Sequence, residues 1–298
     1  MKTRSKARRT NEPSFLEIEP KAGFALRGQR KLHFVTGLFD TIARTYDLLN
    51  IFISLGMTSV WRWLALSALR KRVVPQSCDD RHVSARPGRV RRQRCDDSDD
   101  EECALSRSHI RVLDVGCGTG ASTRAAARRM RACAAIRGFK LHVEGLDCSP
   151  EMLRIAGETK DDACCTYTRG DAENLPYRDG VFDAVLSVYT LRNFGTIAIA
   201  LKEMVRVTRS GGSVLLLDAF VPRNVVVRAL LRVWMRGIVP AIAGLLSHSR
   251  AYEYLAESIQ GSTPAADVAA MLRKLGCVDV QVVDMMFGSA AYIVATKQ

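Results

Sequence analysis

Long apolar runs are missing from this sequence. No run of about eighteen apolar residues is free of charge, and a helix that spans a bilayer needs about twenty, so no spanning segment is expected. No two cysteines have CxxC spacing, and the nine cysteines are an odd number. The sequence therefore indicates neither a disulfide framework nor a zinc ribbon. We expect no metal site and favour a reducing compartment.

Acidic residues are scarce relative to basic ones. The 31 Asp and Glu stand against 44 Lys and Arg, which gives a formal charge of +13. This balance admits acidic substrates, nucleic acid or anionic lipid headgroups as partners. The first ten residues are strongly basic, but the apolar segment of a secretory signal does not follow them, so no such signal is expected. Their arginine content keeps a mitochondrial presequence as an alternative.

Composition and periodicity divide the chain into four segments. A basic, flexible tail is expected over residues 1–31 and a helical segment over 32–75, where Gly56 separates two helices. Residues 76–108 run from an arginine cluster into an acidic cluster, which predicts a disordered insert. The main folded domain is expected over 109–298. The insert also contains residues whose spacing matches no metal-ligand pattern, namely Cys78, His82, Cys95 and Cys103.

From residue 109 onward the pattern is that of βαβ units, which implies a parallel sheet. We expect strands at 110–115, 141–146, 165–168, 182–188 and 213–219, and two final strands at 278–284 and 291–295. Helices are expected at 121–131, 196–208, 225–246 and 264–275. Gly211 and Gly212 are predicted to form a turn before the fifth strand.

A glycine-rich turn joins the first strand to the first helix of this domain. Its sequence is Asp114-Val115-Gly116-Cys117-Gly118-Thr119-Gly120, and glycines at this place let the backbone approach a ligand closely. Ala121 stands where the dinucleotide fingerprint has its third glycine, a substitution that the fingerprint tolerates. Asp114 and Gly120 fit S-adenosylmethionine better, because an acid at this strand end can hold the ammonium group of that cofactor.

Two further acids follow the next two strands. Asp147 ends the second strand, where a carboxylate can accept both ribose hydroxyls. Asp171 follows the third strand, where it can accept from the adenine amine. Each of these acids alone could equally be an ordinary turn residue. An acid at each of three strand ends, however, predicts an S-adenosylmethionine site.

Other stretches are more specific than the glycine turn. They are Phe39-Asp40-Thr41-Ile42-Ala43 with Tyr46-Asp47 and Asn50, Gly170-Asp171-Ala172-Glu173-Asn174-Leu175-Pro176-Tyr177, Leu191-Arg192-Asn193, and Tyr252-Glu253-Tyr254-Leu255 with Glu257-Ser258-Ile259. In these stretches the sequence resembles the ubiquinone and menaquinone biosynthesis C-methyltransferases, within the class I S-adenosylmethionine-dependent methyltransferases. The resemblance extends from Phe39 to Gly288 except for the insert.

The resemblance implies a Rossmann-like α/β fold. Its expected features are a mostly parallel seven-stranded sheet, a C-terminal antiparallel hairpin, and an N-terminal helical cap over a methyltransferase domain. It also implies an enzyme that methylates the ring of a polyprenyl quinol, either demethylmenaquinol or 2-methoxy-6-polyprenyl-1,4-benzoquinol. The cofactor contacts that it implies are Thr119, Asp147, Asp171, Ala172 and Ser187.

This sequence departs from the family pattern at three positions. Tyr189-Thr190 stands where the family usually has Phe-Gly, and Ala256 stands where it has Pro. These changes leave the fit of the substrate open. The segment before the first strand is also longer than is usual in the family.

Methylation of a quinol ring carbon requires a ring hydroxyl that is deprotonated or nearly so. The protein then has to stabilise the developing quinolate. Arg192, after the fourth strand, is the predicted charge stabiliser, and Asn193 is predicted to position the same oxygen. Arg192 is not expected to be the base, because its pKa exceeds about 12. Without the resemblance, Arg192 would be interpreted as a surface arginine at a strand end.

Arginines at four-residue spacing interrupt the apolar segment 225–246. Arg228, Arg232 and Arg236 predict a basic amphipathic helix, which either contacts anionic lipid or packs on the core with one solvated face. We expect a cytoplasmic protein that is peripheral at the inner membrane, with the mitochondrial matrix as the alternative. A homodimer is left open.

Two other functions compete with quinol methylation. The basic balance suggests an RNA or nucleobase methyltransferase, but Ser187-Val188-Tyr189-Thr190 stands where amino-group methylases carry an Asn/Asp-Pro-Pro-aromatic motif. No nucleic-acid partner is therefore expected. The second alternative is a cofactor-binding scaffold without turnover in a quinone-synthesis assembly.

Overall fold

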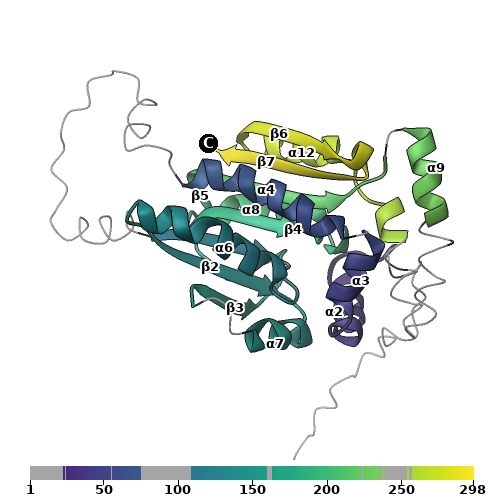
Figure 1. Cartoon of the computed structure of the whole chain (residues 1–298), viewed down its shortest axis with the longest axis horizontal. Coiled ribbons are helices and arrows are strands. Elements are labelled where there is room, and N and C mark those ends of the chain that lie inside the picture. Colours follow the sequence, from purple (N-terminus) through teal and green to yellow (C-terminus); the bar gives the residue numbers. More distant parts are fainter. Residues whose placement is uncertain are drawn as a thin grey trace, which may run out of the picture.

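The computed structural model describes residues 23, 25–54, 56–74, 109–159, 163–222, 224–234, 237, 254 and 257–298. The predicted insert and most of the predicted tail lie outside these ranges. The described elements form one seven-stranded sheet with helices on both faces (Figure 1). Among the described helices, none is both long and apolar enough to cross a membrane.

The sheet has the order β3-β2-β1-β4-β5-β7-β6. The first five strands pair in parallel, whereas β7 is antiparallel to both β5 and β6. The predicted fold class is thereby confirmed. Chain order reverses between β1 and β4, which is where ligands bind in such sheets. The strands are β1 His109–Val115, β2 Lys140–Asp147, β3 Cys165–Arg169, β4 Phe182–Val188, β5 Thr208–Ala219, β6 Cys277–Met285 and β7 Ala290–Lys297.

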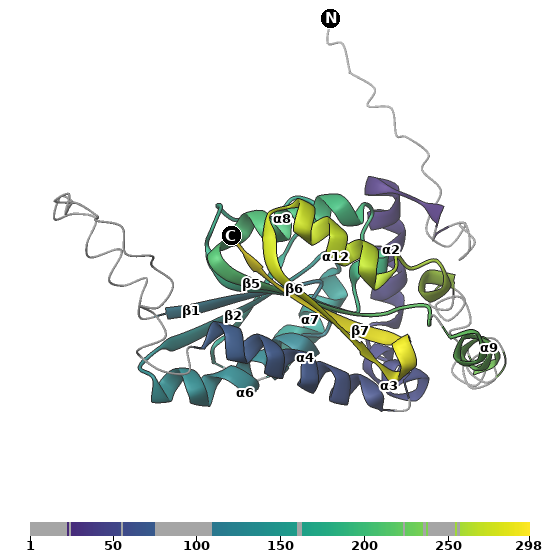
Figure 2. The same cartoon turned by 90° about the horizontal axis from the view of Figure 1, so that it is seen from above.

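Helices cover both faces of the sheet. α4 and α6 lie on one face, and α8 and α12 lie on the other (Figure 2). Side chains of a strand alternate between these faces, so Leu216 of β5 packs in one core and Leu215 and Leu217 pack in the other. The helices are α2 Gly28–Ile42, α3 Tyr46–Ile53, α4 Met57–Val73, α6 Ala121–Ile136, α7 Pro150–Glu158, α8 Ile197–Val207, α9 Val225–Val233 and α12 Ala265–Lys274, with short 3-10 turns η2 Leu191–Asn193 and η4 Met286–Gly288.

Within its described residues from Gly28 onward, the N-terminal cap has three helices where the sequence predicts two. α2 ends before α3 because Thr45 closes a turn on Ile42, with its amide 2.9 Å and its hydroxyl 3.2 Å from the Ile42 carbonyl oxygen. The predicted break at Gly56 is present, and Gly56 has a φ of 77°. α2 begins at Gly28, which is earlier than the expected boundary at residue 32.

The predicted turn at Gly211 and Gly212 is wrong, because β5 continues through both residues. The pairing with β4 shifts register between Phe182 and Ala184, as it does at a β-bulge. Gly211 has a φ of 73°, which supplies the left-handed residue of such a bulge. The glycines therefore bend a strand and do not interrupt it.

Helix α9 is the described part of the predicted basic amphipathic helix. None of its residues is buried, so the interpretation as a helix packed on the core is wrong for this part. Val225, Val226, Leu230 and Val233 are 65–74% exposed. Arg236 lies outside the described residues.

Candidate functional site

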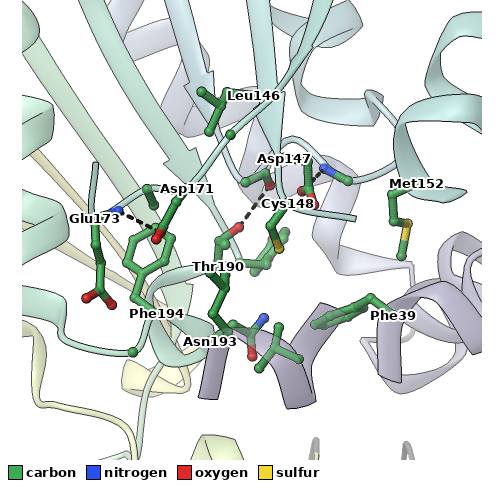
Figure 3. Close-up of a pocket in the computed structure, with 18 of the residues that line it drawn as sticks. Phe39, Leu146, Asp147, Cys148, Met152, Asp171, Glu173, Thr190, Asn193 and Phe194 are labelled. Carbon is green, nitrogen blue, oxygen red and sulfur yellow. Dashed lines mark hydrogen bonds between the residues drawn. The ribbon is translucent and has the colours of Figure 1, made fainter. Parts of the chain in front are cut away.

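A cavity of about 70 Å³ lies at the carboxyl ends of the central strands, beneath helix α2. Its wall combines the glycine turn after β1, the ends of β2, β3 and β4, and apolar side chains of α2 (Figure 3). The predicted site residues on the wall are Gly116, Gly118, Asp147, Asp171, Ala172 and Asn193.

The glycine turn is held against the end of β4. The Thr190 hydroxyl donates to the Gly116 carbonyl at 3.0 Å, and Gly116 has a φ of 76°. A Cβ atom at Gly116 would lie 2.2 Å from Cγ2 of Thr190. The position therefore requires glycine for its backbone and for the space that Thr190 occupies.

The Asp147 carboxylate is fixed on the cavity wall by two backbone amides. Oδ2 accepts from the Gly118 amide at 2.8 Å and Oδ1 from the Ser149 amide at 2.9 Å. Burial raises the pKa of Asp147, and these amides oppose the rise. Each carboxylate oxygen has a further lone pair, so the group can still accept from ribose hydroxyls as predicted.

Replacing Asp147 tests this role. Asp147→Ala is expected to raise the dissociation constant of S-adenosylmethionine by roughly tenfold or more, because each bond to a charged acceptor contributes about 1.5–3 kcal/mol. Calorimetry measures the constant, and Asp147→Asn, which keeps one acceptor oxygen, should lose less. Unchanged affinity in a folded Asp147→Ala protein would remove the ribose assignment.

Asp114 is fully buried at the end of β1 and lies behind the cavity wall, not on it. Its Oδ2 accepts from the Thr123 hydroxyl at 2.7 Å, while Oδ1 has no hydrogen-bond partner among the described residues. Burial raises the pKa of Asp114 to about 7. The hydroxyl of Ser187, at the end of β4, is likewise buried without a described partner. Both groups are fully buried and neither lines the cavity, so the structure does not bring the predicted cofactor residues Asp114 and Ser187 onto its wall.

The raised pKa of Asp114 makes stability depend on pH. Between the unfolded pKa near 3.9 and about 7 the folded protein binds more protons than the unfolded chain, so stability falls as pH rises. Asp114→Asn should therefore raise the free energy of unfolding by at least about 1 kcal/mol at pH 8 and have little effect at pH 4. Thermal unfolding at both pH values measures this. The control is Asp279→Asn, an exposed site, and equal shifts in both variants would contradict the prediction.

Asp171, after β3, lines the same cavity as the glycine turn. Its Oδ1 accepts from the Glu173 amide at 2.9 Å, and its Oδ2 is 3.4 Å from the amide nitrogen of Gln29 in α2. Glu173 also lines the cavity and accepts from the Thr196 amide at 2.6 Å. Sequence reasoning missed Glu173 as a site residue, although it belongs to one of the family stretches.

Several predicted site residues are close to the cavity without lining it. Thr119 donates through its hydroxyl to Asp47 of α3 at 2.8 Å. The structure thus places Thr119 at the contact between the glycine turn and the cap. The predicted residues outside the wall are Asp114, Thr119, Gly120, Ser187 and Arg192.

Arg192 is buried in an ion pair with Asp218 at the end of β5. Their side chains are 4% and 2% exposed, so Arg192 is not the surface arginine of the alternative interpretation. Arg192 Nε and Asp218 Oδ2 have no hydrogen-bond partner among the described residues. Tyr46 lines the cavity in front of this pair. Burial raises the pKa of the Tyr46 phenol, and the charge of Arg192 opposes the rise.

The cap is joined to the site by polar contacts that the sequence did not reveal. Lys31, in the segment predicted to be a flexible tail, is buried and donates to the Arg192 carbonyl at 2.9 Å. The Ser149 hydroxyl donates to Asp40 of α2 at 2.5 Å. Tyr254 donates to Asn193 Oδ1 at 3.2 Å. Asp40 and Tyr254 belong to the stretches that resemble the family, and this resemblance could have identified them as site residues.

The sequence matches the model of the ubiE/COQ5 methyltransferase family over residues 92–297. A protein of Chlorobaculum parvum named demethylmenaquinone methyltransferase is 30% identical over 264 residues, which cover 88% of this chain and 92% of that protein. A protein of the same name from Mycolicibacterium vanbaalenii is 32% identical over 266 residues, which cover 89% of this chain and 95% of that protein. The chain therefore belongs to the ubiE/COQ5 methyltransferase family and is an S-adenosylmethionine-dependent methyltransferase.

Proposed function

We propose that this enzyme methylates a ring carbon of demethylmenaquinol, a polyprenyl naphthoquinol. The names of the relatives support this substrate. The structural observation that carries the proposal is a cation, Arg192, fixed close to a cavity whose α2 side is apolar. A quinol ring needs apolar surroundings, and its developing oxyanion needs a positive charge.

The cavity provides an apolar wall for an aromatic ring. Leu32, Val35 and Phe39 of α2 line it together with Phe194 from the segment after η2, and Phe39 and Phe194 approach it from different elements (Figure 3). S-adenosylmethionine, when bound, supplies a methyl group that is activated by the positive sulfur. The chain has only to align the ring carbon with that methyl group and to exclude water.

Two neutral donors are placed to hold the quinol oxygen. Burial raises the pKa of the Tyr46 phenol, so Tyr46 keeps its proton at neutral pH and can donate it. The Asn193 carbonyl oxygen already accepts from Tyr254, which leaves the Asn193 amide group to donate into the cavity. The positive charge of Arg192 behind Tyr46 favours the ionised form of a quinol bound there.

A methylation assay with two substrates tests the proposal. The pure enzyme is mixed with cofactor and either a short-chain demethylmenaquinol or the demethylated methoxybenzoquinol, in detergent solution without a bilayer. We expect single-turnover methyl transfer to the naphthoquinol. Faster transfer to the benzoquinol would favour the other quinone, and binding of cofactor without transfer to either ring would support the scaffold alternative. Mass spectrometry of the quinones in a deletion strain gives the cellular result.

A polyprenyl substrate resides in a bilayer, so we also propose a cytoplasmic enzyme that is peripheral at the inner membrane, with helix α9 in contact with lipid. The exposed apolar side chains of α9 and its arginines support this contact.

Replacing the arginines of this segment tests the contact. Changing Arg228, Arg232 and Arg236 to Gln should release the protein from anionic vesicles at physiological salt, because each charge contributes about 1 kcal/mol. Sedimentation with vesicles measures the effect. Equal sedimentation of parent and variant would show that α9 does not bind lipid through these charges.

A further inference from the structure

A second concavity lies between α4 and α6. These two helices lie on the same face of the sheet (Figure 2), and the concavity shares no lining residue with the cavity beneath α2. Its volume is about 450 Å³. Four arginines line it, Arg62 from α4 and Arg124, Arg128 and Arg129 from α6, together with Trp63. We call it the arginine groove.

No carboxylate lines the arginine groove. None of its four arginines forms an ion pair within the described ranges, whereas Arg206 and Arg209 elsewhere pair with acids. Four like charges in one concavity repel one another and attract anions to it. The groove therefore has the charge of an anion site.

Two of the four guanidinium groups already have partners. Arg124 donates to the Thr119 carbonyl at 2.9 Å and to the Tyr167 hydroxyl at 3.3 Å. Arg129 donates to the Ser67 hydroxyl at 2.7 Å and lies over the Trp63 ring at 4.6 Å. Arg62 and Arg128 have no hydrogen-bond partner in the part of the chain that is described. Their donors are available, and guanidinium groups bind phosphate well.

An exposed apolar stripe borders the groove. Val60, Trp63 and Leu64 of α4 are 47%, 53% and 39% exposed, and their spacing of three and four residues places them on one side of the helix. A small soluble anion would not cover these apolar side chains, whereas the apolar part of a bilayer would. Tryptophan with flanking arginines is typical of the interface between lipid headgroups and acyl chains.

We propose that the arginine groove binds the phosphate groups of anionic phospholipids at a bilayer surface, with the stripe of Val60, Trp63 and Leu64 inserted beside them. The aliphatic members of the stripe favour a bilayer over RNA, whose bases stack on aromatic rings. This proposal rests on the proposed function in one respect: a polyprenyl substrate is the reason why the enzyme would bind to a membrane.

The arginine groove is also adjacent to the glycine turn after β1. Arg124 contacts the carbonyl of Thr119 in the glycine turn, and Arg62 is close enough to the Asp114 carboxylate to lower its pKa. Docking through the groove would thus place the cofactor site within a short distance of the bilayer, where a polyprenyl quinol resides.

Vesicle binding by the full chain tests the proposal. The probes are phosphatidylcholine vesicles with and without phosphatidylglycerol. The variant is Arg62→Gln/Arg128→Gln, which leaves the contacts of Arg124 and Arg129 in place. The matched control is Arg131→Gln/Arg137→Gln, which removes one exposed charge from α6 and one from its C-cap, both outside the groove. Thermal unfolding verifies that each variant is folded.

We expect binding to depend on phosphatidylglycerol. The groove variant should bind about thirtyfold more weakly than the parent, at roughly fivefold for each charge, and the control variant should lose distinctly less. The fluorescence of Trp63, isolated by comparison with Trp63→Phe, should shift to shorter wavelength on anionic vesicles only.

Three results would overturn the proposal. One is equal vesicle binding by the groove and control variants. Another is binding of inorganic phosphate by the groove while vesicles leave the fluorescence of Trp63 unchanged. This result would indicate that the ligand of the groove is a soluble anion. The third is groove-dependent binding of a single-stranded RNA oligomer without vesicle binding. Methyl transfer in detergent is independent of all three, so failure here is distinguishable from failure of the proposed function.

Discussion

Arg192→Met is expected to lower the rate of methyl transfer by roughly tenfold or more, because the developing oxyanion loses a nearby positive charge. The loss is smaller than the value of about 2.7–4 kcal/mol for a donor in direct contact with an oxyanion, because Arg192 does not line the cavity. Cofactor affinity should change much less, because Arg192 does not line the cavity that contains Asp147 and Asp171. Single-turnover methylation of a short-chain demethylmenaquinol and calorimetry of cofactor binding measure the two quantities on one preparation.

The same substitution also affects stability. It leaves the Asp218 carboxylate buried without its cation, and breaking a buried ion pair from one side costs about 3–5 kcal/mol. A low rate could then come from a damaged fold alone. Arg192→Met/Asp218→Leu replaces both charges by apolar side chains, which is often neutral for stability.

The double variant therefore separates the two roles of Arg192. Denaturant unfolding should show that its stability recovers toward that of the parent, while its rate of methyl transfer stays as low as in Arg192→Met. The pH dependence of the remaining rate should move to higher pH, since the quinol loses the cation that favours its ionised form. Recovery of both stability and rate in the double variant would show that Arg192 serves only to neutralise Asp218.

The centre of the sheet could be predicted from the sequence because strands β1 and β4 are buried on both faces. Residues 110–115 and 182–188 are short apolar runs between turn signals, a pattern that local rules interpret correctly. The break at Thr45 could not be predicted, since it depends on one side chain bonding to a carbonyl three residues back. Gly211 was misjudged because a glycine signals a bulge and a turn equally well.

Only those residues of the candidate site that lie at the ends of strands could be predicted from the sequence. Asp147 and Asp171 follow strands that local patterns locate, so their convergence on one cavity could be expected. The partner of Arg192 could not, because Asp218 lies one strand further along the sheet and 26 residues away in the chain. Lys31 was assigned to the tail by its charge, and its burial depends on a carbonyl of the distant η2 turn.

Gly116→Ala is expected to be the most damaging substitution in the glycine turn. Alanine at a φ of 76° costs about 1–2 kcal/mol, and its Cβ would also meet Thr190 at 2.2 Å, which adds about 1–3 kcal/mol of overpacking. Gly116 and Thr190 both line the cavity, so cofactor affinity should fall by roughly tenfold or more together with stability.

Gly138→Ala is the matched control for the backbone. Gly138 has a φ of 74°, and a Cβ atom there would meet nothing within 4 Å. Its substitution should cost only the conformational part, about 1–2 kcal/mol, and leave cofactor affinity unchanged. The difference between the two variants then measures the contact with Thr190.

The double variant Gly116→Ala/Thr190→Gly completes the comparison. Removing the Thr190 side chain removes the overlap, but it leaves the strained φ and also removes the hydrogen bond to the Gly116 carbonyl, so stability should recover only part of the way toward that of Gly138→Ala. Cofactor affinity should rise with it, because the added methyl group then no longer pushes the glycine turn away from the end of β4. Denaturant unfolding and calorimetry of the parent, Gly116→Ala, Thr190→Gly and the double variant give the cycle. If Thr190→Gly fails to improve Gly116→Ala, the turn tolerates the overlap by moving as a unit, and Thr190 does not determine its place in the site.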